Sequence, residues 1–267
     1  VPIQTPLTTG ASPGVLVGAG PNSKLNLDSL VRELQICLFN PRFLHSIACT
    51  DRKSVPANLF NTSSSSWYFT NLTLANGIGD WDNAFGFVNG ATLTLSGVKI
   101  QNFKSSNFGI MGVQASATLI MTDVEFSQCT GGGGSILYMD HSSGVITNLK
   151  MTQSQSKVGL YSNIFLVTSS LRLQGSIDFV DTQPADDGLP TGGIVATGSG
   201  SITSQANNPA MVTSSGVNRL IYAYQPNALS FTIGGIDMQG ADTQSSVFSV
   251  TTLNATSTIS FIVFRDL

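Results

Sequence analysis

An apolar-x-apolar triplet recurs about every 26 residues through most of the chain, and this repeat restricts the fold more than any other feature. The pattern is anchored on Val98-Lys99-Ile100. Its counterparts are Leu72-Thr73-Leu74, Val124-Glu125-Phe126, Leu149-Lys150-Met151, Ile177-Asp178-Phe179, Ile236-Asp237-Met238 and Ile262-Val263-Phe264. One further anchor is expected near residues 204–208, and an earlier turn at Ile47-Ala48-Cys49. A period of this length is typical of solenoids, in which each repeat stacks on the next.

Each repeat contains two more short apolar strands. One precedes the anchor by half a repeat, as in Ile136-Leu137-Tyr138, and the other comes shortly before it, as in Leu93-Thr94-Leu95. Gly, Ser and Asn residues separate the strands. Because side chains alternate across a strand, every second residue points inward. The pattern predicts an all-β chain folded as a right-handed parallel β-helix, with three short strands in each coil.

The middle residue of each anchor is expected to point outward. Coils stack at about 4.8 Å, so Lys99, Glu125, Lys150 and Asp178 would form one column with charges of alternating sign. Each exposed pair contributes less than about 1 kcal/mol. The column mainly favours one register, because a slip of one residue would bury the charges.

The two ends of the chain differ from the repeat. Residues 1–44 are predicted to form an extended N-terminal segment and residues 45–267 the β-helix. Within the first segment, residues 28–38 have helical spacing, with Asp28 as N-cap, and are expected to cap the solenoid. At the other end, Phe261, Ile262, Val263 and Phe264 have no polar cap after them. Either residues are missing from the chain, or another chain covers this end, which would make it an assembly surface.

The composition excludes some partners. Charged residues make up 10% of the chain, against a typical value of about 25%, and the net charge is −3. This argues against binding to nucleic acid or to an anionic membrane. No run of about 18 apolar residues occurs, so no transmembrane segment is expected. Hydrophobic residues at 41% are sufficient for a packed core.

Sequons and cysteines bear on the compartment. The sequons at Asn61, Asn71 and Asn254 predict glycosylation and an extracellular location, on a cell or virion surface. A disulfide between Cys37 and Cys49 and three buried thiols, with Cys129 the third, are equally compatible with the sequence. Because the chain has no Cys/His ligand cluster, no structural metal and no cofactor are expected.

The coil sequences resemble a known superfamily. Residues 93–103, Leu-Thr-Leu-Ser-Gly-Val-Lys-Ile-Gln-Asn-Phe, and the corresponding residues 119–129 resemble coils of the pectin-lyase-like superfamily. Within it they are most similar to cell-surface β-helix proteins of the polymorphic outer-membrane type. Gly133-Gly134-Ser135-Ile136 and Gly192-Gly193-Ile194 resemble the Gly-Gly-Ala-Ile signature of that type, although the accompanying Phe-x-x-Asn half is absent after most coils. The resemblance covers residues 45–267 and implies architecture more than function.

Two sets of carboxylates are candidates for catalysis. Asp186-Asp187 resembles the paired aspartates of polygalacturonases, but no Gly-His-Gly and no Arg-x-Lys follow. We therefore interpret both as solvated loop residues. Asp82, with Asp80, flanks Trp81, which could bind sugar but is expected to pack instead. The Asp140-His141 pair reads as a polar loop contact, because no third partner is evident.

These observations favour a non-enzymatic extracellular structural protein: a surface fibre, a filament subunit or an adhesin that forms homo-oligomers. Two alternatives stay open. One is a polysaccharide lyase or hydrolase, or a viral tailspike-like depolymerase, and the other is a glycan-binding module without catalysis.

Overall fold

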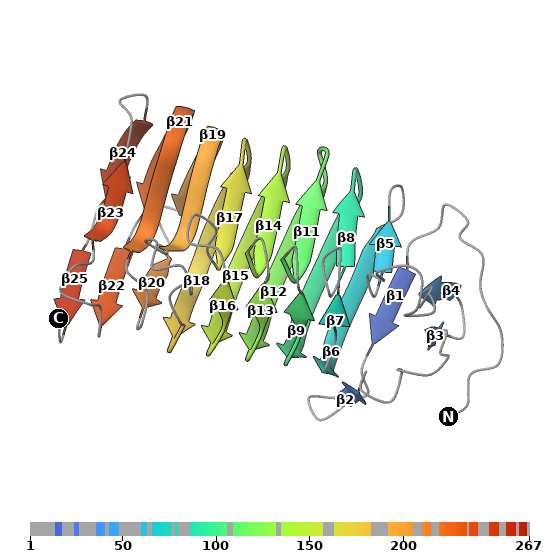
Figure 1. Ribbon diagram of the computed structural model, residues 1–267. Coiled ribbons are helices and arrows are strands. Elements are labelled where there is room, and N and C mark those ends of the chain that lie inside the picture. Colours follow the sequence, from blue (N-terminus) through green and yellow to red (C-terminus); the bar gives the residue numbers. More distant parts are fainter. Residues whose placement is uncertain are drawn as a thin grey trace.

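The computed structural model describes most of the repeat region and parts of the segments that flank it (Figure 1). The described residues are 14–17, 24–26, 36–40, 43–47, 60–62, 66–75, 78–79, 86–105, 109–131, 135–156, 163–182, 192–204, 210–214, 219–233, 235–239, 246–250, 255–259 and 262–265. Their regular structure consists of strands alone. No helix that is long and apolar enough to cross a membrane occurs in this part of the chain.

The chain forms a parallel β-solenoid of about four regular turns, spaced by about 26 residues, as the repeat predicts. Parallel pairing continues on both sides of these turns. The first face of each turn is formed by β5 (Phe60–Thr62), β8 (Gly86–Asn89), β11 (Met111–Gln114), β14 (Leu137–Asp140), β17 (Ile164–Val167), the first parts of β19 (Gly192–Ser204) and β21 (Arg219–Ile233), and β23 (Ser246–Val250).

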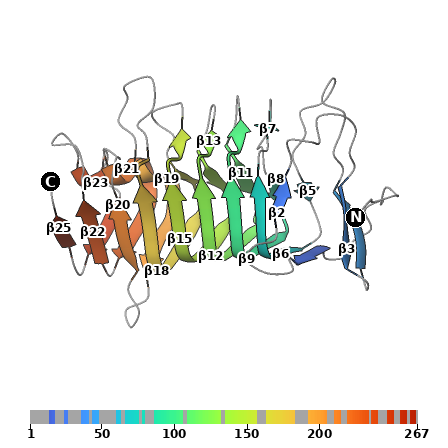
Figure 2. The same cartoon turned by 90° about the horizontal axis from the view of Figure 1, so that it is seen from below.

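The second and third faces share five long strands that run side by side in Figure 2, each divided by a bend. These strands are β6 (Trp67–Ala75), β9 (Thr92–Gln101), β12 (Thr118–Ser127), β15 (Ser143–Thr152) and β18 (Ser170–Val180). The second face also contains β1 (Gly14–Val17), the later parts of β19 and β21, and β24 (Ala255–Ile259); the third also contains β2 (Lys24–Asn26), β20 (Met211–Ser214), β22 (Gly235–Gln239) and β25 (Ile262–Arg265). A short sheet of β7 (Ile78–Gly79), β10 (Lys104–Ser105), β13 (Thr130–Gly131) and β16 (Gln155–Ser156) follows the third face.

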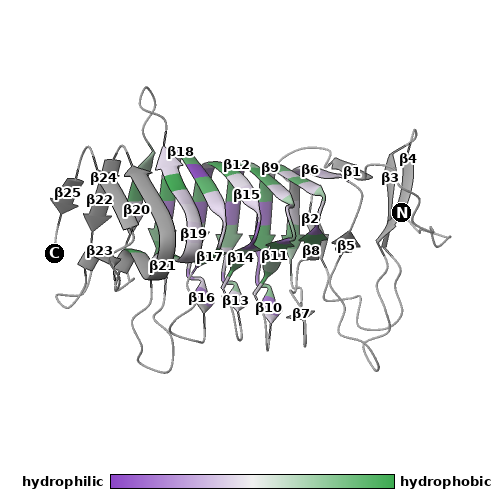
Figure 3. Cartoon of the chain, turned by 90° about the horizontal axis from the view of Figure 1, so that it is seen from above, coloured by the Kyte–Doolittle hydropathy of each residue, from purple (hydrophilic) through white to green (hydrophobic). Residues whose placement is uncertain are grey.

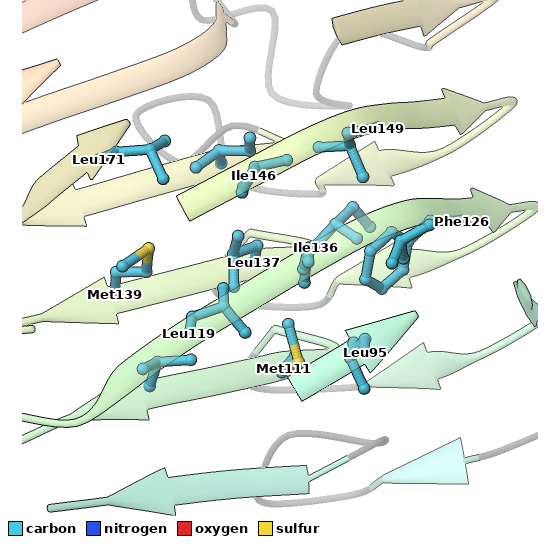
Figure 4. Close-up of a cluster of buried hydrophobic side chains, with 14 of the residues drawn as sticks. Leu95, Met111, Leu119, Phe126, Ile136, Leu137, Met139, Ile146, Leu149 and Leu171 are labelled. Atoms are coloured by element: carbon cyan, nitrogen blue, oxygen red, sulfur yellow. The ribbon is translucent and has the colours of Figure 1, made fainter. Parts of the chain in front are cut away.

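The core is a set of inward rows, one residue from each turn. Strand β12 alternates buried and partly exposed side chains, which is the pattern the triplets predict. One row stacks Phe126 between Ile100 and Met151, and all three side chains are fully buried. Figure 4 shows Phe126 beside Leu149 and the neighbouring rows. Stacked apolar rows of this kind bury the inner surface of every turn against the next.

The first parallel turn comes from an unexpected part of the chain. Strand β1 pairs with the first half of β6, and β2 pairs with its second half, with Leu25 beside Leu74. The prediction that Ile47-Ala48-Cys49 forms this turn is wrong, because Ile47 lies in β4 (Phe43–Ile47), paired antiparallel with β3 (Ile36–Asn40). Part of the predicted N-terminal segment therefore belongs to the solenoid sheet, and the hairpin is inserted after it.

The helix predicted over residues 28–38 is wrong for its last three residues. Residues 36–38 lie in β3, while 28–35 lie outside the described residues. The local sequence explains the strand: Ile36 and Phe39 favour extended backbone, and Pro41 between the two strands favours a turn. The apolar spacing that suggested a helix is equally compatible with a short buried strand.

The anchor expected near residues 204–208 lies elsewhere. Strand β20 occupies its register, with Val212 beside Ile177 and Thr213 beside Asp178. This turn is therefore longer than the others and the next one is shorter. Ser214 takes the position that Phe or Met fills in most anchors, which is why the triplet is hard to recognise in the sequence.

Candidate functional site

The outward column of the third face has the predicted register. Glu125 pairs with Lys99 on one side and Lys150 on the other, and Lys150 pairs with Asp178. The column continues to Thr73 and Lys24 at one end and to Thr213 at the other. Lys99 Nζ lies 3.0 Å from Glu125 Oε2, and their side chains are 50% and 27% exposed. At this exposure, the pair stabilises the fold by about 1 kcal/mol at most.

A second column runs along the bend between the second and third faces. All five members, namely Asn71, Gly97, Asp123, Asn148 and Gly175, have positive φ values between 48° and 63°. Asn, Asp and Gly adopt this backbone conformation most readily. Asn148 Nδ2 donates to Asp123 Oδ1 at 2.8 Å, and Asn148 Oδ1 accepts from the Ser176 amide at 3.1 Å. The bend column is thus held by hydrogen bonds between turns.

The two columns line a surface groove of about 350 Å³. Its lining residues are Asn71, Gly97, Lys99, Asp123, Val124, Glu125, Asn148, Leu149, Lys150, Ser176 and Asp178. At Gly97 the Asn71 side chain fills the space that a Cβ would take, since a Cβ there would lie 2.5 Å from Asn71 Oδ1. Residues of the bend column and of the charged column therefore line the groove together.

Most charged groups of the groove have a polar partner in the protein. Asp178 accepts from Ser176 Oγ at 2.8 Å and from Thr213 Oγ1 at 2.5 Å. Asp123 binds Asn148, and Glu125 binds Lys99. Lys150 is the one charged lining residue that makes no side-chain hydrogen bond or ion pair with any described residue. The groove can offer one ammonium group and fixed amide groups to a polar ligand, and its carboxylates are engaged rather than poised for proton transfer.

Asp140 and His141 form a separate polar pair. His141 lies at the corner after β14 with a φ of 46°, and its Nδ1 is 2.5 Å from Asp140 Oδ1. The side chains are 66% and 28% exposed. Neither side chain makes another hydrogen bond within the described residues, although the backbones of both residues pair with neighbouring turns. This matches the interpretation of a polar loop contact, and a catalytic arrangement would need a third group.

The predicted site residues are divided between the described part of the chain and the rest. Those that lie outside the described residues are Cys49, Asp82, Asp186, Asp187, Asn254 and Phe261. Cys37 lies in β3, and Ile262, Val263 and Phe264 lie in β25, paired with β22. Asn61 lies in β5 and Asn71 in β6, where the Asn71 side chain is exposed. No group of three metal-binding side chains occurs in the part of the chain that the structure describes.

Cys129 is a buried free thiol at the corner after β12. Its Sγ lies 3.5 Å from the carbonyl oxygens of Ile100 and Ser127. Burial raises the pKa of the Cys129 thiol to about 12. The side chain is part of the core and is chemically inert there.

We predict that Cys129 does not react with iodoacetamide at pH 8 in the native protein and reacts fully in denaturant. Mass spectrometry of the peptide that contains Cys129 measures this. Because the pKa of Cys129 is raised in the folded protein, its contribution to stability depends on pH. The contribution is complete below about pH 9 and is lost as the pH rises towards about 12. Cys129→Ala should lack that part of the loss. Rapid alkylation under native conditions would contradict the buried position.

The fold and the groove define a class: a parallel β-solenoid with a surface groove, lined by charged and amide side chains, between its second and third faces. Comparison of the chain with protein-family models, with curated proteins and with solved structures found no match. The sequence pattern predicted the charged column but not the bend column. A signal for the latter was present, since Asn71, Gly97, Asp123 and Asn148 recur with the period of the repeat.

Proposed function

We propose that the chain is a non-enzymatic extracellular structural protein, namely a surface fibre, a filament subunit or an adhesin. The observation that carries this proposal is the continuous parallel pairing of the turns, which joins Lys24, Thr73, Lys99, Glu125, Lys150, Asp178 and Thr213 in one column. A solenoid in which each turn contacts only its neighbours extends in one dimension and offers long regular faces. The engaged carboxylates of the groove favour this role over catalysis.

The coil sequences support a place in the pectin-lyase-like superfamily, near the polymorphic outer-membrane type. This remains a proposal about ancestry, and such folds carry enzymes, adhesins and fibres alike. Glycosylation at Asn61, Asn71 and Asn254 and an extracellular location belong to the same proposal. Exposure of the Asn71 side chain is compatible with it, although Thr73 of that sequon is 7% exposed in a central strand.

Assembly is proposed to involve the strand that contains Ile262, Val263 and Phe264. The backbone of a β-strand can pair on both sides, so stacking through such a strand would continue the sheet into a second copy. A new turn added in this way would extend the same apolar rows that fill the core.

Sedimentation velocity over a range of concentrations, with negative-stain microscopy, tests the structural role. We expect concentration-dependent oligomers or filaments for the full chain. Phe264→Lys, at the inward third position of its anchor, should weaken assembly, and Ser127→Lys, on the third face of a central turn, should not. Protein that stays monomeric at every concentration would contradict the filament form of the proposal, and an unchanged assembly of Phe264→Lys would contradict the interface.

A glycan-binding role is the second candidate, and the groove is the observation that favours it. A polar chain that lies along the solenoid axis would meet the amide of Asn148 and the ammonium group of Lys150, both in β15, and then the groove residues of the neighbouring turns. A glycan array with the full chain would test this. Lys150→Ala should reduce binding, whereas Lys104→Ala on the short sheet should not. An array without any binding would contradict the role.

The enzyme alternative depends on residues outside the described part of the chain. Cleavage of acidic polysaccharides, assayed with and without calcium, would support it. Loss of that activity in Asp186→Ala, Asp187→Ala or Asp82→Ala would then replace the structural proposal.

A further inference from the structure

The second face carries an ordered array of small hydroxyl and β-branched residues. One column has a hydroxyl residue in seven successive turns: Thr92, Thr118, Ser143, Ser170, Ser201, Ser230 and Thr256. The next column, two residues further along each strand, contains Thr94, Ile120, Val145, Arg172, Thr203, Thr232 and Thr258. A third column contains Thr70, Ser96, Thr122, Thr147 and Gln174. This set is called the hydroxyl face below.

The array points outward wherever its side chains are described. In β9, β12 and β18 its members are partly or fully exposed, and the residues between them, such as Leu93, Leu119 and Leu171, are buried. Figure 3 shows the same alternation of hydrophobic and hydrophilic bands along these strands. Ile120 is 37% exposed, which is unusual for a large apolar side chain in this protein. In β9, β12, β15 and β18, each member of the first two columns has a buried residue on both sides, and this fixes the direction of its side chain.

The backbone sets the spacing of the array. Turns are about 4.8 Å apart along the axis, and residues i and i+2 of one strand are about 6.7 Å apart. The pairing has no register shift within the hydroxyl face between β9 and β18, since the shift between β15 and β18 falls at the bend. Thr, Ile and Val have few χ1 rotamers, so their methyl and hydroxyl groups keep this repeat. The result from β9 to β15 is a stiff, two-dimensional lattice of hydroxyl and methyl groups. In β18 the lattice is interrupted by Arg172 and by Gln174, whose Oε1 accepts a hydrogen bond from Thr147 Oγ1 at 2.8 Å.

The chemistry of the face narrows the choice of ligand. Among the described turns, Arg172 is its one charged member, so a charged polymer is not favoured. A protein partner is not favoured either, because Ser is depleted in protein interfaces and Arg172 would be buried without a counter-charge. Tyr68, 38% exposed, is the one aromatic side chain in the described part of its column, so sugar rings have no row on which to stack.

We propose that the hydroxyl face binds ice. Hydroxyl groups held at fixed intervals order the first shell of water, and the methyl groups between them leave that water no competing partner. Water in such a layer repeats in two dimensions, as the oxygen atoms of an ice surface do. Each additional turn in register then adds further matched positions, so affinity grows with the length of the solenoid.

Partition into a slowly growing ice hemisphere, with microscopy of ice recrystallisation, tests the proposal on the full chain. Wild type is expected to be enriched in the ice and to keep crystals small. The double variant Thr94→Lys/Thr122→Lys, which disrupts the centre of the face, should fall to the level of serum albumin. Ser127→Lys, on the third face of the same strand, should behave as wild type. Ile120→Thr should retain binding, because it extends the hydroxyl column.

Three results would overturn the proposal. The first is wild-type protein that is excluded from ice. The second is a double variant that partitions as wild type while thermal melting shows that it is folded. The third is protein that is excluded from ice but sediments with crystalline cellulose or chitin, or dimerises through this face, because the ligand would then be a polysaccharide surface or a second copy. Melting curves separate loss of binding from loss of folding.

Discussion

Phe126→Ala is expected to lower the free energy of unfolding by about 3–5 kcal/mol. The Phe126 side chain is fully buried and stacks between Ile100 and Met151 of the adjacent turns. Removing the ring leaves a cavity that the neighbouring rows cannot fill, because the backbone fixes the separation of the turns. Urea titration followed by circular dichroism would measure the change.

Ser127→Ala is the matched control for Phe126→Ala, since residue 127 follows in the same strand and points outward. Its expected effect is within about 0.5 kcal/mol. In a solenoid, the turns next to the cavity should unfold first. The early part of the urea transition should therefore differ most between Phe126→Ala and Ser127→Ala. A Phe126→Ala protein as stable as Ser127→Ala would contradict the stacked core.

Gly200→Ala is expected to destabilise the protein by at least about 2 kcal/mol. Gly200 has a φ of 151°, and a Cβ at this position would lie 2.0 Å from the backbone oxygen of Ser169 in the previous turn. The close approach is needed because the amide of Ser201 donates to that same oxygen. The backbone of one turn must therefore move away from the other. Thermal melting monitored by circular dichroism would measure the loss.

Gly144→Ala provides the comparison for Gly200→Ala. Its added Cβ would meet the end of the Met139 side chain at 2.9 Å, and Met139 can change rotamer more easily than a backbone can shift. We expect Gly144→Ala to cost clearly less stability than Gly200→Ala. Equal losses in the two variants would mean that the turns around Gly200 are not packed as the structure has them.

The regular turns could be predicted from the sequence because every level of the pattern agrees there. The triplets alternate apolar and polar residues, turn residues separate them, and the period stays close to 26. This agreement gave the register of Lys99, Glu125 and Lys150, which the pairing of β9, β12 and β15 confirms. A one-residue slip in any of these strands would have buried a charge.

Irregular parts were predicted less well, for identifiable reasons. Strands β1 and β2 pair with β6 across a long stretch of chain, and no local pattern reveals such a distant neighbour. The hairpin of β3 and β4 has apolar spacing that fits either a helix or a strand. The anchor in β20 has Ser214 in place of a third apolar residue. Only the period of about 26 residues therefore predicted its position, and the period placed it too early, at residues 204–208.

The sequence predicted only one of the two columns that line the groove. Its charged column follows from alternation, but its depth depends on the bend column, where Asn71 covers Gly97 and Asn148 covers Gly175. These contacts require the positive φ values that only the folded backbone reveals. Repetition of Asn, Asp and Gly with the period of the triplets was the available signal.

Spin labels on neighbouring turns test the stacked register most directly. Thr94 pairs with Ile120, and Ile120 with Val145, so labels on Thr94→Cys/Ile120→Cys would attach about 4.8 Å apart and labels on Thr94→Cys/Val145→Cys about twice that. With Cys37 and Cys49 changed to Ser, and Cys129 buried, continuous-wave electron paramagnetic resonance should show strong spin–spin broadening for the first pair and much weaker broadening for the second. Spectra of both pairs that equal the sum of the single-label spectra would contradict the parallel solenoid.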